Sequence, residues 1–455
     1  QNPFDFDGGY MGAGITGAVT LSGSGDAVIN NSAHIALSGI ISGTGSLCKA
    51  GGGSLFLTGT NIYSGGPSLL GGALVVSNDA NLGAAPATAT GNSLVFGGGT
   101  LRATGSFTLA NTRSATATSN ASFEVDSGAT LTFDGIISGA GGLAKLGAGT
   151  LQVGGQSSFT GDTLISAGTL GFKSVPGTST SALGAYPATF RAASITIADG
   201  ATLYEMVAGG NVTMAANRGV ILSGGTATIR HNGGGSWFRI DGVISGSGNL
   251  DVRSDGGNNL RLGGDNTFTG TTRLYGDMFV LNSNALGLQN STLDYNNYGG
   301  QLLFTTGGVR ATIGGLSGSQ NLLMQECSSC GGSGPTFVGL TIRSNADSTY
   351  SGVLSGRANL SKEGTGNLTL TGINTYTGGT AINAGTIAVG SATALGGTSG
   401  AVTIGGGTLD LKGQSLTTGA VTLSAGSIVD SANTAGSLTA ASLTANNTNA
   451  VTVSA

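Results

Sequence analysis

Charged residues, histidines and long apolar runs are all scarce in this sequence. Asp, Glu, Lys and Arg make up 8% of the 455 residues, and the formal net charge is −4. No basic patch able to neutralise phosphates is visible, so nucleic acid is not expected as a partner. No run of 18 apolar residues occurs, so no helix is expected to span a bilayer. With only His34 and His231 present, a Ser-His-Asp site has few ways to form.

Cysteine is also rare, with three residues in the chain. Cys327 and Cys330 form C-x-x-C, which could be a local disulfide in an oxidising compartment, two free thiols, or part of a metal or redox site. No second pair accompanies them and the histidines are remote, so we favour a disulfide and expect no metal and no cofactor. Cys48 is too distant along the chain to bridge to either residue, and is expected to be free, buried or used between molecules.

Glycine, by contrast, is abundant, with 87 residues. The glycines punctuate short runs in which apolar and polar residues alternate, as where Leu368 and Leu370 alternate with Asn367 and Thr369. Period two predicts short strands with one buried face, and the intervening glycines mark turns. The sequence therefore predicts an all-β fold with almost no helix.

The run from Ser355 to Gly397 occurs four times, with units that start near residues 42, 138, 245 and 355. The distance from the opening serine to a following aromatic residue is 21, 21, 23 and 21 residues in chain order. A fixed unit repeated in this way indicates a stacked repeat architecture. We expect the aromatics to be stacking or coil-edge residues, and the asparagines at 61, 266 and 374 to stack at turns.

The third copy departs from the others. It has Val252 where the other copies have Lys49, Lys145 and Lys362, and its glycine turn is two residues longer. It also has Asp277 where the other copies have glycine, at Gly72, Gly168 and Gly385, which are the expected structural turns. A positive φ is expected at those glycines.

The pattern Ser-Gly-x-Gly-x-Leu-x-Lys, followed by an apolar strand, an aromatic and Leu-Gly, resembles the passenger-associated transport repeat, or autotransporter-associated β-strand repeat, of bacterial autotransporters. The resemblance implies a right-handed parallel β-solenoid, here of roughly twenty coils. It also implies export from a Gram-negative-type cell and display outside it, but no particular activity. The C-terminal membrane barrel of autotransporters is not recognisable in the sequence, and the start at Gln1 is compatible with signal cleavage.

Residues 1–34 are irregular, and residues 35–455 are expected to form a single continuous solenoid. The aromatics Phe4, Phe6 and Tyr10 suggest either a cap over the first coil or an arm that docks on another molecule. The last residues stay solenoid-like. An open stack of this kind could associate head to tail into a fibre.

Residues 229–279 concentrate charge and hold the single tryptophan. We predict a candidate ligand face for a glycan or a surface protein from six residues: Trp237, Arg239, Asp241, Arg253, Arg261 and Arg273. The alternatives are an outward ladder of Arg and Asp across adjacent coils, which we favour, and a catalytic site. Glu124 and Asp126 share a strand face, and an exposed polar face explains them better than catalysis does.

The leading hypothesis is a non-enzymatic extracellular protein that forms a rigid solenoid rod at the cell surface, with itself as a possible partner in a fibre. The first alternative is an adhesin that binds through residues 229–279. The second alternative is a polysaccharide-active enzyme with its acids in that segment. No catalytic residue is assigned.

Overall fold

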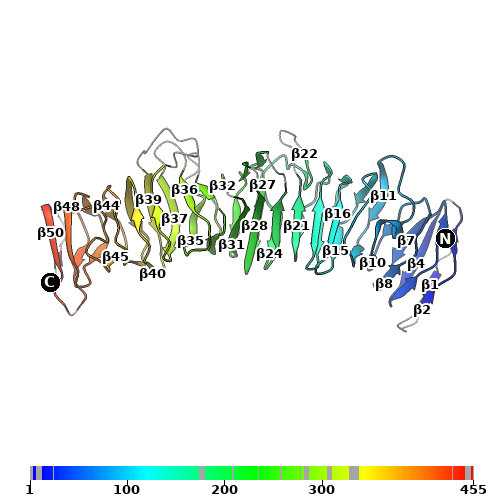
Figure 1. The fold of residues 1–455 in the computed structure, drawn as a ribbon, viewed down its shortest axis with the longest axis horizontal. Helices are drawn as coiled ribbons and strands as arrows, with labels where there is room; N and C mark the ends of the chain where they lie inside the picture. The colour runs from blue at the N-terminus through cyan, green and yellow to red at the C-terminus, as the bar shows by residue number, and fades with distance from the viewer. Residues whose placement is uncertain are drawn as a thin grey trace. The chain divides into compact units, whose positions relative to one another are not determined.

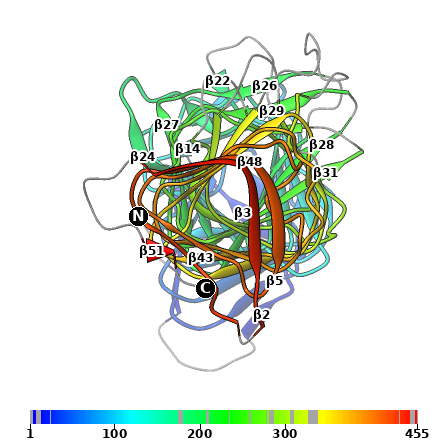
Figure 2. The same cartoon turned by 90° about the vertical axis from the view of Figure 1, so that its left-hand side faces the viewer.

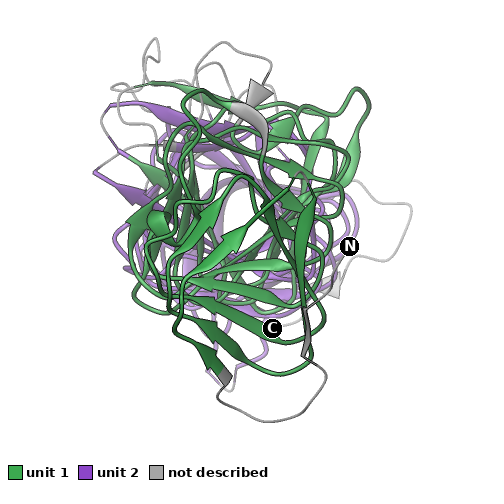
Figure 3. Ribbon diagram, turned by 90° about the vertical axis from the view of Figure 1, so that its right-hand side faces the viewer, with its two compact units in different colours: residues 1–232 green, residues 233–455 purple. Residues whose placement is uncertain are grey.

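The computed structural model describes residues 4–6, 13–23, 25–173, 180–206, 210–233, 235–256, 259–276, 278–280, 286–304, 310–326, 338–432, 434–445 and 452–453. The chain divides into two compact units, residues 1–232 and 233–455 (Figure 3), and each is described by itself. Parallel strands stack as a β-solenoid of about 18 turns. The all-β parallel solenoid predicted from the sequence is therefore confirmed. Among the described residues the helical content is one 3₁₀ turn, η1 (Asp79–Leu82).

The first unit has three parallel sheets, which are visible as neighbouring arrows in Figure 1. Sheet 1 contains β1 (Phe4–Phe6), β4 (Asp26–Asn31), β7 (Ser46–Ala50), β9 (Ser68–Leu69), β11 (Thr90–Phe96), β14 (Arg113–Ala117) and β17 (Ile137–Ser138). Sheet 2 contains β2 (Ala13–Ile15), β5 (Ile35–Leu37), β8 (Ser54–Leu57), β10 (Ala73–Val76), β12 (Thr100–Ala103), β15 (Ala121–Val125), β18 (Leu143–Leu146), β20 (Thr163–Ile165), β24 (Arg191–Ala198) and β27 (Arg218–Ser223). Sheet 3 contains β13 (Phe107–Thr108), β16 (Thr130–Phe133), β19 (Thr150–Val153), β21 (Thr169–Phe172), β25 (Thr202–Glu205) and β28 (Thr226–Asn232). The unit also holds β3 (Val19–Leu21), β6 (Ile41–Gly43), β26 (Val212–Met214) and the antiparallel pair β22 (Thr180–Ser181) and β23 (Gly184–Ala185).

The second unit repeats this organisation. Sheet 4 contains β31 (Asn249–Asp255), β33 (Thr271–Leu274), β35 (Leu288–Asp294), β37 (Arg310–Ser317), β39 (Val338–Arg343), β42 (Ala358–Glu363), β44 (Thr380–Ile382), β46 (Val402–Ile404), β48 (Ser415–Leu423) and β50 (Ser437–Ala445). Sheet 5 contains β29 (Trp237–Ile240), β32 (Asn259–Leu262), β34 (Met278–Val280) and β36 (Leu302–Phe304). Sheet 6 contains β40 (Ser348–Tyr350), β43 (Asn367–Leu370), β45 (Thr386–Val389), β47 (Thr408–Asp410), β49 (Ser427–Val429) and β51 (Thr452–Val453). The short strands β30 (Ile244–Gly246), β38 (Leu322–Leu323) and β41 (Leu354–Ser355) complete it. Figure 2 shows β48 and β43, from sheets 4 and 6, on different sides of the coil.

Each coil buries one face of its strands, as the alternation predicted. In β43, Leu368 and Leu370 are fully buried while Asn367 and Thr369 are partly exposed. β43 pairs in parallel with β45, which places Leu368 beside Ile387. The aromatics at 63, 159, 268 and 376 are all buried. The stack of apolar residues supplies the core that each coil alone would lack.

The repeat lysines are buried, although a charged residue in an apolar row would ordinarily face solvent. Lys362 has no exposed surface, and its Nζ donates to the carbonyl oxygens of Ser344, Glu363 and Gly364 at 3.2, 2.7 and 2.8 Å. Lys49 and Lys145 also make three bonds each, two to carbonyls of their own turn and one to a carbonyl of the next coil, whereas Ser344 lies on the coil before Lys362. Burial lowers the pKa of both Lys49 and Lys145 to about 8, and that of Lys362 in the same direction. We call each ammonium with its three carbonyls a lysine cage.

The repeat asparagines tie successive coils together. Asn374 accepts a bond from the Leu354 amide at 2.8 Å and donates to the Ala394 carbonyl at 2.6 Å, so it joins the coils before and after its own. Asn61 and Asn266 do the same. In the second copy Ser157 replaces Asn and accepts the Ile137 amide at 3.1 Å. These buried amides satisfy backbone groups that the turns leave without a ladder partner.

The turn glycines close the lysine cages. Gly72, Gly168 and Gly385 have φ of 59°, 64° and 63°. A Cβ at Gly385 would overlap the carbonyl oxygens of Gly364 and Gly366 and lie 2.9 Å from Lys362 Nζ. Only glycine combines this backbone conformation with so close an approach.

Strand pairing begins before residue 34. β1, which contains Phe4 and Phe6, pairs in parallel with β4, and β2 and β3 pair with β5 and β6. Tyr10 lies outside the described residues. Whether residues 1–34 act as a cap or an arm, and whether residues 35–455 form a single continuous solenoid, stay predictions.

Candidate functional site

The six residues of the predicted ligand face lie on two different sheets of the second unit. Trp237, Arg239 and Asp241 are on or next to β29, and Arg261 is on the neighbouring β32, so these four belong with sheet 5. Arg253 and Arg273 lie on β31 and β33 of sheet 4. β31 ends at Asp255 on sheet 4, and β32 begins at Asn259 on sheet 5. The six residues therefore fall into two groups by sheet, which we call the tryptophan cluster and the charge ladder, and their role in ligand binding stays a prediction.

The tryptophan cluster is built by strand register. Arg239 and Arg261 are direct cross-strand partners, and the Arg261 guanidinium carbon lies 4.8 Å from the centre of the Trp237 ring. Arg239 also pairs with Asp241. Burial and the nearby Arg239 lower the pKa of Arg261. The cluster therefore places two guanidinium groups and one carboxylate beside a partly buried aromatic ring.

The charge ladder links the outer faces of β31, β33 and β35. Asp251 carboxylate oxygens lie 3.5 Å from both Arg253 and Arg273, and Arg273 continues to Asp294 at 3.3 Å. Arg253 also covers the Tyr275 ring at 4.0 Å. Tyr298 donates to Asp294 at 3.0 Å, and its ring lies 5.1 Å from that of Tyr275. This chain of opposite charges is the outward Arg and Asp ladder that we favoured from the sequence.

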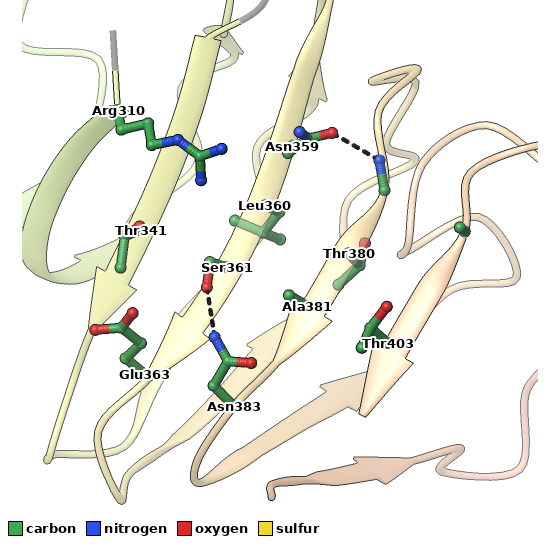
Figure 4. A pocket seen from close by; sticks show the side chains of 12 residues that line it. Arg310, Thr341, Asn359, Leu360, Ser361, Glu363, Thr380, Ala381, Asn383 and Thr403 are labelled. Atoms are coloured by element: carbon green, nitrogen blue, oxygen red, sulfur yellow. Dashed lines mark hydrogen bonds between the residues drawn. The ribbon is translucent and has the colours of Figure 1, made fainter. Parts of the chain in front are cut away.

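A third surface feature, which the sequence did not predict, is an open groove of about 490 Å³ on the outer face of sheet 4. Figure 4 shows that polar side chains line it: Arg310 on β37, Asn359, Ser361 and Glu363 on β42, and Thr403 on β46. Gly379 and Ala381 also line it. The signal for it in the sequence is a set of small residues that recurs at the coil spacing.

One histidine and one glutamate meet in the closed interior, whereas the other pair of acidic residues considered from the sequence is half-buried at the surface. His231 Nδ1 lies 2.7 Å from Glu205 Oε2, and both side chains are fully buried. The sequence does not predict this pair, because Glu205 and His231 come together only through the parallel pairing of β25 with β28. Glu124 and Asp126 lie 3.8 Å and 2.9 Å from Arg102, so an ion pair accounts for them.

Two buried arginines were also missed. Arg113 donates to Asp79 Oδ1 at 2.6 Å and to the Gly83 carbonyl at 2.6 Å. Arg218 donates to the Leu183, Gly184 and Ala185 carbonyls at 2.6, 3.0 and 2.9 Å, and burial lowers its pKa to about 10. Each arginine fixes the Leu-Gly end of the preceding repeat, 30 or more residues earlier in the chain.

The remaining sequence predictions concern cysteine, metal and membrane. Cys327 and Cys330 lie outside the described residues, so their disulfide stays a prediction, while Cys48 is a buried free thiol. In the described ranges no group of three or more His, Cys, Asp or Glu side chains could hold a metal ion. Over the same ranges no helix is long and apolar enough to cross a bilayer.

Comparison with known families identifies the passenger-associated-transport-repeat at residues 47–76, 143–171, 255–276 and 360–389. The chain therefore carries four of these repeats, in the four units that the glycine-punctuated pattern delimited. It is 43% identical over 131 residues to the adhesin BmaC autotransporter of Brucella suis biovar 1 (strain 1330). The match covers 29% of this chain and 4% of that protein, so this chain spans a small part of its curated relative. No solved structure matches.

Proposed function

We propose that this chain is a non-enzymatic adhesin segment, displayed at or beyond the outer surface of a Gram-negative-type cell. The four transport repeats and the similarity to an autotransporter adhesin support export and adhesion. The observation that carries the proposal is the division between interior and surface. The buried lysines, asparagines and arginines bond mainly to backbone carbonyl and amide groups of their own and adjacent coils, which leaves recognition to the outer faces.

The tryptophan cluster is the proposed adhesive contact. Tryptophan and arginine are over-represented among the residues that dominate binding energy, because they combine a large apolar area with directional donors. The cluster presents both, with two guanidinium groups and an indole on adjacent strands. A surface glycan or protein with exposed acidic groups suits this chemistry. The charge ladder serves the coil stack, since its Asp and Arg side chains pair with one another.

The solenoid itself is proposed as a stiff spacer that holds this contact away from the cell. Head-to-tail association into a fibre is a further part of the proposal, through the arm that contains Phe4, Phe6 and Tyr10. Deletion of Gln1–Tyr10 should then abolish large assemblies in light scattering and electron microscopy. Monodisperse monomers from both the intact and the shortened chain would rule out the fibre but not the spacer.

A binding experiment tests the adhesive role. Beads coated with the chain are applied to a glycan array and to host-type cells, with Trp237→Ala and Arg261→Ala as variants. Lys412→Ala is the control, because Lys412 is an exposed cation that follows β47 on sheet 6. Loss of binding in the first two variants alone supports the proposal. Equal binding by all of them contradicts it, and release of reducing ends from polysaccharides would contradict the non-enzymatic assignment.

A further inference from the structure

The groove on sheet 4 owes its depth to strand register. Arg310, Gly339 and Asn359 are cross-strand partners in one row, and Thr341, Ser361, Ala381 and Thr403 are partners in the next row. The small residues in these rows, Gly339, Ser361 and Ala381, leave space for the groove between the longer side chains. The groove crosses five strands, from β37 to β46, so at a strand spacing of about 4.8 Å it extends roughly 19 Å. Its length therefore suits an extended chain molecule rather than a compact ligand.

The groove wall offers donors and acceptors in a fixed arrangement. Asn359 Oδ1 accepts the Gly379 amide at 2.9 Å, which orients its side-chain NH₂ away from that bond. Asn383 Nδ2 donates to Ser361 Oγ at 3.2 Å, and its Oδ1 takes no part in that bond. Figure 4 shows both bonds on the groove wall. Thr341 and Thr403 add hydroxyl groups. A ligand rich in hydroxyl groups can exchange hydrogen bonds with such a wall.

The two charges that line the groove differ in their partners. Glu363 is already paired with Arg343, whose Nη2 and Nε lie 3.0 and 3.1 Å from Glu363 Oε2. Arg310 is exposed, and no carboxylate among the described residues lies within ion-pair distance of it. Figure 4 shows its guanidinium extending from β37 across β39 toward Asn359. The groove therefore has one unused cation, at one end of its polar wall.

We propose that this groove binds a carboxylated oligosaccharide. The planar guanidinium of Arg310 matches a carboxylate with two parallel hydrogen bonds. The sugar hydroxyl groups bond to Asn359, Ser361 and Asn383 along the wall. A general attraction for anions is not the cause, because the chain carries a net charge of −4. This site lies apart from the tryptophan cluster in sequence and sheet, so it goes beyond the proposed adhesive contact and does not depend on it.

Calorimetric titration of the whole chain with tetragalacturonate tests the proposal. Cellotetraose is the uncharged sugar control, and tetraglutamate is the carboxylated control without sugar. Arg310→Gln should weaken tetragalacturonate binding by about tenfold or more, because a charge-assisted bond is lost. Lys412→Gln is the matched variant, since it removes the same charge from a lysine outside sheet 4, and it should change the affinity by less than about twofold.

Glu363→Gln tests whether the affinity changes in the direction that electrostatics predicts. It removes the like charge nearest the ligand, so the affinity for tetragalacturonate should rise, and it should rise less at high salt. Trp237→Ala should leave this titration unchanged, which separates failure of this site from failure of the adhesive contact.

Three outcomes would overturn the assignment. The first is no saturable binding of tetragalacturonate. The second is equal binding of cellotetraose, since Arg310 would then not select a carboxylate. The third is equal binding of tetraglutamate, since the groove would then be an acidic-peptide site.

Discussion

The fourth and the third repeats place their charge on opposite sides of the same kind of coil. In the fourth repeat Lys362 is buried in a lysine cage, and the outer strand faces are mostly Ser, Thr and Asn. In the third repeat Val252 fills the equivalent interior position without exposed surface. Its charges lie toward the outer face instead, on the exposed Arg253 and the half-buried Arg273, which both pair with the largely buried Asp251.

This difference distinguishes two kinds of position in the repeat. The signature residues, which are the repeat lysines, asparagines and turn glycines, are needed for the fold, whereas the outer-face residues can vary. The signature residues satisfy backbone groups between coils, so they hold the fold. The third repeat gives up one such residue and places Arg and Asp on its outer strand faces. Substitutions that remove a signature residue should therefore cost stability, whereas substitutions in the outer clusters should alter binding and leave stability nearly unchanged.

The largest effect is expected from Gly385→Val in the fourth repeat. The valine would need φ near 63° and would overlap two carbonyl oxygens beside Lys362 Nζ. Backbone strain and loss of the lysine cage together should cost about 3–5 kcal/mol of the free energy of unfolding, measured by urea denaturation. Gly397→Ala is the control, because the nearest atom to its Cβ would lie 3.5 Å away. An unchanged denaturation midpoint for Gly385→Val would show that this turn is not what fixes the coil.

Lys362→Met should have the next largest effect. Methionine fills the same volume but leaves the carbonyls of Ser344, Glu363 and Gly364 without this donor. Unsatisfied buried carbonyls should cost about 2–3 kcal/mol at pH 7. The exposed Lys412→Met should cost almost nothing in the same urea series. If Lys362→Met is as stable as the parent, the lysine cage is dispensable. An apolar residue such as Val252 of the third repeat would then stabilise the coil as well as the lysine does.

Much of the fold follows from short-range pattern, whereas the sites depend on register between coils. The alternation of Leu368 and Leu370 with polar neighbours predicts a strand and its buried face. Two of the carbonyls around Lys49 come from its own turn, but the third belongs to Gly71, one coil later, and nothing near Lys49 in the sequence reveals that third partner. Glu205 and His231 likewise meet through strand pairing 26 residues apart.

The predicted ligand face shows a related limit. Arg253 and Arg261 are eight residues apart; Arg253 follows Val252, and Arg261 stands between two leucines, a pattern that predicts an outward side chain for both. A coil with several sheets has several outward directions, and these two residues lie on strands of different sheets, β31 and β32. Alternation tells inside from outside but does not tell one outer face from another.

A pH series sharpens the contrast between the lysine repeats and the third repeat. The pKa of Lys49 and Lys145 falls from 10.5 to about 8 on folding. Between these values the unfolded chain binds more protons, so stability increases as pH rises through about 8 and is lost as pH falls again. The expected gain from pH 7 to pH 9 is about 1 kcal/mol per lysine.

The gain is measured by urea denaturation at each pH and compared with that of Lys49→Met/Lys145→Met. Work above pH 9 is avoided because Cys48, whose pKa burial raises, has the opposite effect there. A parent curve parallel to that of the double variant would show that the cages hold their lysines charged throughout.

The smallest expected effect comes from one hydroxyl, and it compares the fourth repeat with the first. Tyr376 and Thr380 share a buried hydrogen bond of 2.6 Å in the fourth repeat. In the first repeat the equivalent residues are Tyr63 and Pro67. Proline has no hydroxyl, and the buried Tyr63 hydroxyl has no hydrogen-bond partner among the described residues. In the second repeat the roles are reversed: Phe159 has no hydroxyl, and the Thr163 hydroxyl is the group without a partner in the part of the chain that the structure describes.

Removing the same hydroxyl should therefore have opposite consequences in the two repeats. Tyr376→Phe should lower the free energy of unfolding by about 1 kcal/mol, because the hydrogen bond to Thr380 is lost. Tyr63→Phe should leave the free energy of unfolding unchanged or raise it, because it removes a desolvated hydroxyl that has no partner. Thr163→Val should follow Tyr63→Phe, and Thr380→Val should follow Tyr376→Phe. Urea midpoints of the four variants decide the matter. Equal losses of stability for Tyr63→Phe and Tyr376→Phe would mean that the Tyr63 hydroxyl is hydrogen-bonded after all. Pro67 in place of threonine would then have no effect on the stability of the coil.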